Sequence, residues 1–314
     1  MRAFHALFLF LGVFISLSSV GKPSQSVRLD IPYKTTPEGV LHLDLYYPDS
    51  VLSGKYPLVI YTHGGGWVTG SKKGATVGNM AKVVNSLTQK GFCVASVEYR
   101  LWSKDGNVSM RDCVIDSKDA IRYLSKNDSS LFVDSERVFA FGDSAGGQIA
   151  QMLLLTSPES LSGADELAGY SYKMIAGVSW YGPCDFEKTE LFNPDGRENF
   201  KDRFGLRILK PDTDPKDKSA LYREMSPINY LRKNSPPLLM IQGDKDTTIP
   251  IHHAYYMKEK ADAVQAPVEI FIVKNAGHNW RQVDDPIEPS AAVIVQRTVG
   301  FLCDHLNANV TNSL

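Results

Sequence analysis

The sequence predicts an α/β fold in which helices cover both faces of a mostly parallel central sheet. Short apolar segments alternate with helical patterns from about residue 58 onward. Several of these segments lack polar alternation, as is typical of strands buried on both faces of a parallel sheet. An alternating pair of segments precedes them, which indicates an N-terminal antiparallel hairpin. Repeated strand–helix units after a hairpin favour a sheet covered on both sides.

The hairpin is predicted from Val27–Tyr33 and Leu41–Tyr47, which a Pro-Glu-Gly turn joins. The further strands are predicted at Leu58–Thr62, Cys93–Tyr99, Val138–Gly142, Ile175–Trp180, Leu238–Gln242 and Val268–Val273. The helical patterns cover Asn79–Lys90, Met110–Lys126, Gly147–Leu155, His252–Val264 and Ala291–Leu306.

Composition restricts the class of protein. The 34 basic and 35 acidic residues give a net charge of −1, which lacks the basic surplus expected of a nucleic-acid binder. Hydrophobic residues at 43% and charged residues at 22% are typical of a soluble globular protein. We therefore expect no nucleic-acid partner.

The first 21 residues have the pattern of a secretory signal peptide. A basic start precedes a short apolar stretch, and small residues stand before Lys22. An uncleaved membrane anchor is the alternative, although the stretch is short for a span. We predict an exported protein, secreted or periplasmic, with one domain over 22–314 and no stable membrane insertion after signal removal. Oxidative pairing is open for its four cysteines, Cys93, Cys113, Cys184 and Cys303.

One segment, 186–236, interrupts the strand–helix alternation. Between residues 186 and 218, 16 of 33 residues are charged, and phenylalanines are interspersed among them. A solvated insertion with a small core of its own is one interpretation. The other is a cap over an active site, with its aromatic side chains facing a substrate.

A Gly-x-Ser-x-Gly motif gives the strongest chemical signal. It places Ser144 between the strand ending at Gly142 and a helical pattern. Small residues at 142 and 146 permit a sharp turn that lifts the serine hydroxyl out of the sheet. The following helix N-terminus places backbone donors, Ala145 first, near any negative charge that develops there. We therefore predict Ser144 as a nucleophile.

A second motif, His63-Gly-Gly-Gly-Trp67, follows the strand at 58–62. Consecutive glycines allow the backbone to approach a ligand closely. We expect the N–H groups of Gly65 and Gly66, with Ala145, to bind an oxyanion. His63 is interpreted as a positioning residue. Trp67 fits a pocket wall or a core position equally well.

The serine needs a base and an acid. His278 is predicted as the base, because it lies in a loop after the last strand, where open α/β sheets place reactive side chains. Asp244 and Asp246 both follow the strand at 238–242. We prefer Asp246 as the acid, because it lies further along the loop and Asp244 is placed to brace the turn. The chain order Ser, Asp, His is that of one hydrolase architecture.

These motifs, in this order and spacing, resemble the α/β-hydrolase superfamily over about residues 40–305. They are most similar to the esterase/lipase branch with an HGGG loop, which includes bacterial feruloyl esterase-like (BD-FAE) and hormone-sensitive-lipase-like carboxylesterases. The resemblance implies a serine carboxylesterase that works by acyl transfer through Ser144, Asp246 and His278, without metal or organic cofactor. It also implies oxyanion donation from Gly65, Gly66 and Ala145.

The expected substrate is a small-molecule or polysaccharide-linked ester, acyl or aromatic. Trp67, Trp180, Tyr181 and Trp280 are candidates to stack on it, although all four also suit a core. An amidase, a formamidase sharing the HGGxW loop, or a peptidase is the alternative within enzymes. A non-catalytic binding module of the same fold is the alternative outside them. The oligomeric state is left open.

Overall fold

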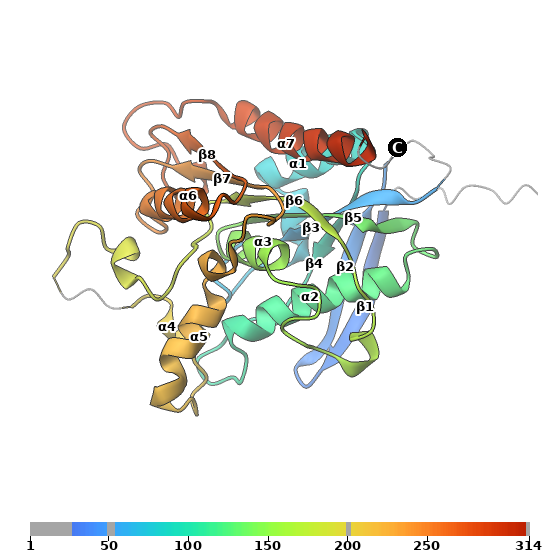
Figure 1. The fold of residues 1–314 in the computed structure, drawn as a ribbon, viewed down its shortest axis with the longest axis horizontal. Coiled ribbons are helices and arrows are strands. Elements are labelled where there is room, and N and C mark those ends of the chain that lie inside the picture. Colours follow the sequence, from blue (N-terminus) through green and yellow to red (C-terminus); the bar gives the residue numbers. More distant parts are fainter. Residues whose placement is uncertain (1–26, 49–53, 199–201, 312–314) are drawn as a thin grey trace, which may run out of the picture.

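The structure, a computed structural model, describes residues 27–48, 54–198 and 202–311, of which the last three are described by their backbone only. The predicted signal peptide, 1–21, lies outside the described residues. Eight strands form one sheet in the order β1-β2-β4-β3-β5-β6-β7-β8 (Figure 1). Its strands are β1 (Val27–Thr36), β2 (Gly39–Tyr46), β3 (Tyr56–Thr62), β4 (Cys93–Val97), β5 (Val133–Asp143), β6 (Met174–Trp180), β7 (Leu238–Gly243) and β8 (Val268–Val273).

The sheet is antiparallel at one edge and parallel elsewhere. β1 pairs with β2 and β2 with β4 in antiparallel fashion, and all pairs from β4 to β8 are parallel. The helices are α1 (Gly78–Gln89), α2 (Met110–Lys126), α3 (Ala145–Leu155), α4 (Gly205–Ile208), α5 (Lys218–Met225), α6 (His252–Val264) and α7 (Ala291–Thr311). The predicted fold class is confirmed, and so are all eight strands and five of these helices.

Strand β3 shows why the parallel strands are apolar throughout. Leu58 and Ile60 pack into the cluster that contains α2 and α3, whereas Val59 and Tyr61 pack into the opposite cluster with α1 and α7. Figure 1 shows α1 and α7 side by side on one face of the sheet. Because helices cover both faces, every side chain of β3 is buried.

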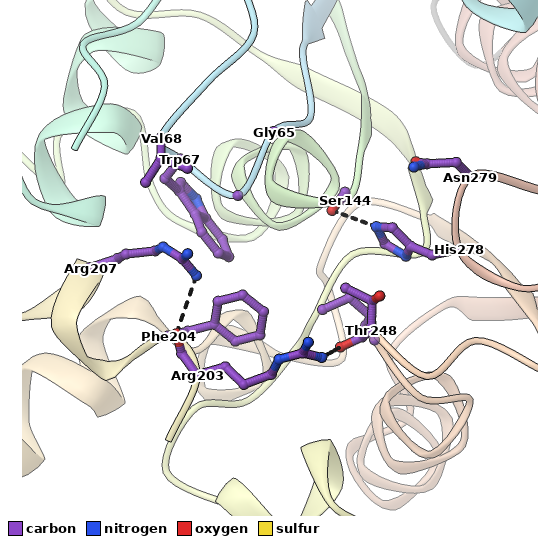
Figure 2. A pocket seen from close by; sticks show the side chains of 12 residues that line it. Gly65, Trp67, Val68, Ser144, Arg203, Phe204, Arg207, Thr248, His278 and Asn279 are labelled. Atoms are coloured by element: carbon purple, nitrogen blue, oxygen red, sulfur yellow. Dashed lines mark hydrogen bonds between the residues drawn. The ribbon is translucent and has the colours of Figure 1, made fainter. Parts of the chain in front are cut away.

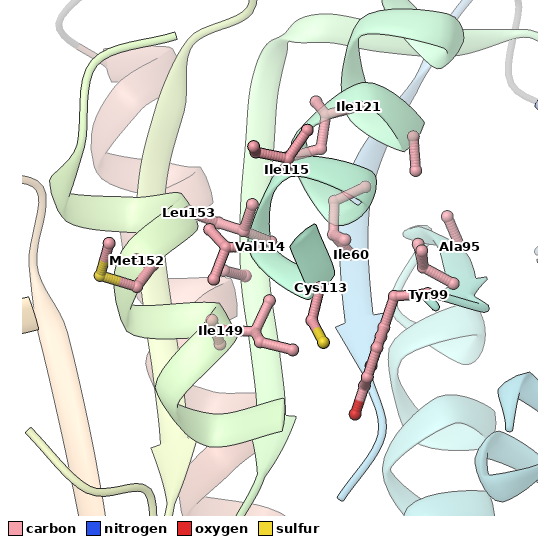
Figure 3. Packing of buried hydrophobic residues seen from close by; sticks show 14 of the residues in the cluster. Ile60, Ala95, Tyr99, Cys113, Val114, Ile115, Ile121, Ile149, Met152 and Leu153 are labelled. Carbon is pink, nitrogen blue, oxygen red and sulfur yellow. The ribbon is translucent and has the colours of Figure 1, made fainter. Parts of the chain in front are cut away.

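The larger cluster joins β3 and β4 to α2 and α3. Figure 3 shows Ile60 between Val114 of α2 and Tyr99, which follows β4. Side chains of this packing lose their exposure almost completely, so removal of one large group would leave a cavity costing roughly 2–5 kcal/mol of folding free energy. This rigid support lies directly beneath the loop that follows β3.

Several element ends differ from prediction. β5 begins at Val133, five residues before the predicted start, and β4 ends at Val97 rather than Tyr99. The charged segment also contains two helices that no apolar periodicity indicated, α4 and α5. Phe186, Phe192 and Phe204 of this segment join the main hydrophobic cluster. The predicted separate small core is therefore wrong, because these rings pack against Trp67 and each other.

The four cysteines are free thiols in the structure, and three of them are buried. Burial raises the pKa of Cys93 and Cys113, so both stay protonated at neutral pH. Within the described part of the chain, no helix is long and apolar enough to cross a bilayer.

Candidate active site

Ser144 occupies a strained turn between β5 and α3. Its backbone has φ 53° and ψ −117°, a region that non-glycine residues rarely adopt. The turn depends on the glycines that stand two positions before and two positions after Ser144. A Cβ atom on Gly142 would lie 2.2 Å from the carbonyl oxygen of Gly146, and one on Gly146 would lie 1.9 Å from that of Thr62. The hydroxyl is consequently held above the carboxyl edge of the sheet.

His278 and Asp246 lie in line with this hydroxyl. Nε2 of His278 is 3.0 Å from Oγ of Ser144, and Nδ1 of His278 is 2.7 Å from Oδ2 of Asp246. Because a carboxylate accepts, Nδ1 carries the proton and Nε2 is left to accept from the serine. The three side chains come from loops after β5, β7 and β8, separated by up to 134 residues in sequence.

Asp246 is held in place by four contacts. Its Oδ1 accepts the backbone N–H groups of Thr248 at 2.8 Å and Ile249 at 2.9 Å. Its Oδ2 accepts from Gln242 at 3.3 Å as well as from His278. The carboxylate is buried, and these donors replace its hydration.

The alternative acid, Asp244, has a different place. Its backbone N–H donates to Val273, and one carboxylate oxygen is buried without a partner among the described residues. It does not contact His278 in any described hydrogen bond. The predicted bracing of the turn by its side chain is thus not seen in the described contacts.

The glycine loop after β3 lies beside Ser144. Gly65 and Gly66 line the same pocket as Ser144 and His278. Gly65 has φ +116°, and a Cβ there would lie 2.1 Å from the carbonyl oxygen of Thr69, so only glycine fits. Ala145 is the first residue of α3, so its N–H has no acceptor within that helix. Gly65 and Gly66 thus line the pocket and Ala145 directly follows Ser144, and their role as oxyanion donors stays a prediction.

His63 supports this loop from below. Its Nδ1 donates to the carbonyl oxygen of Gly64 at 2.8 Å, and its ring stacks on Tyr99 with centroids 4.2 Å apart. The Tyr99 hydroxyl donates to the carbonyl oxygen of His63 at 2.6 Å. Burial lowers the pKa of His63 to about 4, so the ring is neutral at pH 7. His63 therefore contacts the loop rather than the hydroxyl of Ser144.

The pocket above these groups has a volume of about 380 Å³ (Figure 2). One wall is formed by Trp67 and Val68 and another by Thr248, Ile249 and Asn279. The charged segment closes the remaining side through Phe204 and the arginines on either side of it. No motif pointed to Arg203 and Arg207. The one signal in the sequence was their spacing of four residues, which places two side chains on the same face where the backbone is helical.

Three of the four residues predicted to stack on the substrate do not line this pocket. Trp180 is fully buried and donates to Thr298 at 2.8 Å, and Tyr181 and Trp280 pack against it in the core. None of these three lines the pocket. Trp67 does line it, although its ring is almost completely buried and its Nε1 donates to Gln148. Among the described residues, no group of three or more His, Cys, Asp and Glu side chains is placed to hold a metal ion.

Comparison with known proteins gives consistent likenesses. The family model described as BD-FAE matches residues 43–261. The esterase LipC of Mycobacterium tuberculosis is 27% identical over 77% of this chain and 57% of its own length. The isoprenylcysteine alpha-carbonyl methylesterase of Arabidopsis thaliana is 26% identical over 84% of this chain and 59% of its own length. The chain thus spans less than two thirds of the length of these curated relatives.

Solved structures share the fold. A truncated carbohydrate esterase from gut microbiota superposes with a TM-score of 0.71 at 21% identity, covering 90% of this chain and 96% of that one. Propionate-bound esterase 2 of Thermogutta terrifontis superposes with a TM-score of 0.70 at 22% identity, covering 91% and 94%. These superpositions show that the chain shares the fold of these esterases. At identities of 21% and 22% they do not show that it shares their activity.

Proposed function

Because this chain belongs to the BD-FAE family, we propose that it is a carboxylic ester hydrolase that uses Ser144, His278 and Asp246 in a two-step acyl transfer. The observation that carries the proposal is the continuous hydrogen-bonded line from Asp246 through His278 to Ser144, at distances of 2.7 and 3.0 Å. The esterase names of its curated relatives support the same activity.

In the first step, the hydroxyl oxygen of Ser144 attacks the ester carbonyl while Nε2 of His278 takes its proton. Asp246 keeps the imidazole in the required tautomer and stabilises the imidazolium that forms. The carbonyl oxygen becomes an oxyanion that accepts from the N–H groups of Gly65, Gly66 and Ala145. Each such donor is worth roughly 3–4 kcal/mol of barrier lowering.

In the second step, the imidazolium gives its proton to the departing alkoxide, which leaves as the alcohol. Water then attacks the acyl-serine carbonyl, losing a proton to His278, and the carboxylic acid is released as Ser144 regains its proton. In this cycle the chain supplies the nucleophile, the base, the acid and the oxyanion donors, and water is the second substrate.

The proposal is tested with p-nitrophenyl acetate, butyrate and octanoate, using the native protein beside Ser144→Ala. We expect turnover by the native protein and a loss of at least about 10³-fold in the variant. Turnover unchanged in Ser144→Ala would contradict the proposal and favour a binding module. Hydrolysis of matched anilides in preference to the esters would favour the amidase alternative.

Two finer predictions stay predictions. Export depends on the sequence of residues 1–21 alone, and N-terminal sequencing of protein recovered from outside the producing cell tests it. The second prediction is that the substrate is an ester carried on a polysaccharide. Release of the carboxylic acid from an acylated polysaccharide tests it. Trp180, Tyr181 and Trp280 are buried and do not line the pocket, so they lend no support to an aromatic acyl group.

A further inference from the structure

Two cationic side chains line the pocket opposite the nucleophile. Arg203 precedes α4 and Arg207 lies within it, and both line the same cavity as Ser144 and His278. Figure 2 shows the two side chains on either side of Phe204, across the pocket from Ser144. Arg207 lies over the ring of Phe204, with its guanidinium carbon 5.1 Å from the ring centroid. The cavity wall facing the serine is therefore positively charged.

Neither arginine has an acidic partner in the described part of the chain. Arg203 donates through Nη1 to the carbonyl oxygens of Thr247 and Thr248, at 3.3 and 3.5 Å. Arg207 donates through Nη1 to the carbonyl oxygen of Arg203 at 3.2 Å. Among the described residues, no carboxylate lies within ion-pair distance of either arginine. A guanidinium has five N–H donors, so most remain available.

The described residues that line the rest of the pocket supply no compensating carboxylate. Its lining contains glycines, apolar side chains, Thr248, Asn279, His278 and Ser144, and no Asp or Glu. Desolvation, together with repulsion from Arg203, lowers the pKa of Arg207 below the usual value for arginine. Two cations held near each other without counterions in a partly closed cavity are unfavourable when the cavity is empty. An anion bound there would relieve that repulsion.

The position of the pair is fixed by packing beneath it. Phe204 and Ile208 are buried in the main hydrophobic cluster. Oδ1 of Asp202 accepts the backbone N–H groups of Phe204 and Gly205, and its Oδ2 accepts from the hydroxyl of Tyr222 on α5. Because Phe204 and Ile208 are anchored in the core, the backbone that carries Arg203 and Arg207 is held beside the cavity.

We propose that Arg203 and Arg207 bind an anionic group of the substrate, so that the enzyme prefers esters that carry a carboxylate beyond the scissile carbonyl. The inference rests on the proposed esterase function and narrows its substrate class. A guanidinium matches a carboxylate with two parallel hydrogen bonds, which fixes orientation as well as adding affinity. The carboxylate can be carried by the acyl part or by the alcohol part of the ester, and separate substrates distinguish the two.

The alcohol arm compares 4-acetoxybenzoate with methyl 4-acetoxybenzoate. The acyl arm compares the monophenyl ester of adipic acid with phenyl hexanoate. The two esters of each pair are similar in size, and only one of them carries a carboxylate. Values of kcat/KM are measured for the native protein, Arg203→Gln, Arg207→Gln and the double variant. Arg223→Gln is the matched control, since Arg223 is an exposed arginine of the same segment that does not line this pocket.

We expect the native protein to favour the anionic ester in one arm, with the preference falling about tenfold in the double variant. The fall in kcat/KM should be larger for the anionic ester than for the neutral ester, because the neutral ester has no group that pairs with a guanidinium. Arg223→Gln should keep the native preference. Added NaCl should reduce the preference of the native protein and leave that of the double variant unchanged.

An anionic-to-neutral ratio that is the same in the native protein and the double variant, in both arms, would overturn this inference and leave the esterase proposal intact. If the native protein hydrolysed none of the esters, the esterase proposal would be refuted and the inference with it. Arg203→Glu provides a second test that does not depend on the double variant folding correctly. The side chain of Arg203 is exposed, so this replacement should preserve the fold. This variant should disfavour the anionic ester.

Discussion

Asp143 and Gly64 are joined by a hydrogen bond of 3.0 Å between the carboxylate Oδ1 and the backbone N–H. The same oxygen accepts from the hydroxyl of Tyr61 at 3.0 Å. Desolvation raises the pKa of Asp143, and these two hydrogen bonds oppose that effect. The residue directly before the nucleophile therefore holds the start of the glycine loop, and the two halves of the site are fixed relative to each other.

Replacement of Asp143 should impair turnover through the loop. In Asp143→Ala, Gly64 loses its acceptor, and we expect kcat to fall about 10- to 100-fold, with KM changed much less. Asp143→Asn keeps an oxygen that can accept both hydrogen bonds, so it should retain more activity than the alanine variant. Steady-state kinetics on p-nitrophenyl butyrate separate the two parameters. Equal kcat in the native protein and Asp143→Ala would show that the loop holds its position unaided.

The serine turn should tolerate no side chain at Gly146. A Cβ there would lie 1.9 Å from the carbonyl oxygen of Thr62, which belongs to the adjacent strand and cannot move away freely. We expect Gly146→Ala to lower the free energy of unfolding by about 3 kcal/mol or more, and to abolish turnover. Urea denaturation followed by circular dichroism measures the first effect.

Gly300→Ala is the control for that experiment. Gly300 lies inside α7, and a Cβ there meets nothing within 4 Å. Alanine has a higher helix propensity than glycine, so this variant should be more stable than the native protein by roughly 0.5–1 kcal/mol. If both variants lost the same free energy of unfolding, the contact between the new Cβ and the carbonyl oxygen of Thr62 would not explain the effect of Gly146→Ala.

Trp180 should affect stability and leave substrate affinity unchanged. Its side chain is fully buried, and its Nε1 donates to Thr298. Trp180→Phe should lower the free energy of unfolding by about 1–3 kcal/mol, since it removes volume and one buried hydrogen bond. KM for the p-nitrophenyl esters should remain within about twofold. Trp67→Phe is the comparison variant, because Trp67 lines the pocket. An increase in KM in Trp180→Phe but not in Trp67→Phe would support the prediction that Trp180 stacks on the substrate.

Stability should decline on mild acidification because of two buried histidines. Burial lowers the pKa of His253 to about 3 and that of His63 to about 4, whereas the unfolded chain titrates near 6.5. Between pH 6.5 and 4 the unfolded state therefore binds protons that the folded state does not. Each histidine contributes stability that is present above pH 6.5 and decreases by about 1.4 kcal/mol per pH unit below it.

His253→Gln isolates one of these contributions. The ring of His253 accepts the backbone N–H of Cys184 at 3.3 Å, an interaction that the glutamine oxygen can retain. The variant should show a shallower loss of unfolding free energy between pH 6 and 4.5, by about 1 kcal/mol per pH unit. Urea denaturation at pH 7.5, 6 and 4.5 measures the slope. Parallel curves for the two proteins would place the acid sensitivity elsewhere.

The strands and the catalytic line were predictable for one physical reason. Strands buried on both faces are apolar throughout, and their carboxyl ends meet at one edge of a parallel sheet. Ser144, Asp246 and His278 each follow such a strand, so knowing the strands was enough to bring the three side chains together. Choosing Asp246 over Asp244 needed only their order along the loop, and the structure places Asp246 against His278.

The pocket wall was not predictable in the same way. Trp67 ends the motif His63–Trp67 and Trp180 ends a predicted strand. Their sequence context does not say that Trp180 contacts Thr298, 118 residues away, while Trp67 lines the cavity. Arg203 and Arg207 are two charges in a strongly charged segment. Only the path of the chain back across the sheet edge, fixed by Phe204 and Ile208, places them opposite Ser144.

The two parts of the pocket come from separate stretches of chain. The sheet loops supply the serine, the histidine and the glycine backbone, whereas the segment between β6 and β7 supplies the facing arginines. Evolution and protein engineering can therefore treat them as modules. Grafting the segment between β6 and β7 from one relative onto another would exchange the wall that carries the arginines while leaving the loops that hold Ser144, His278 and the glycine backbone unchanged.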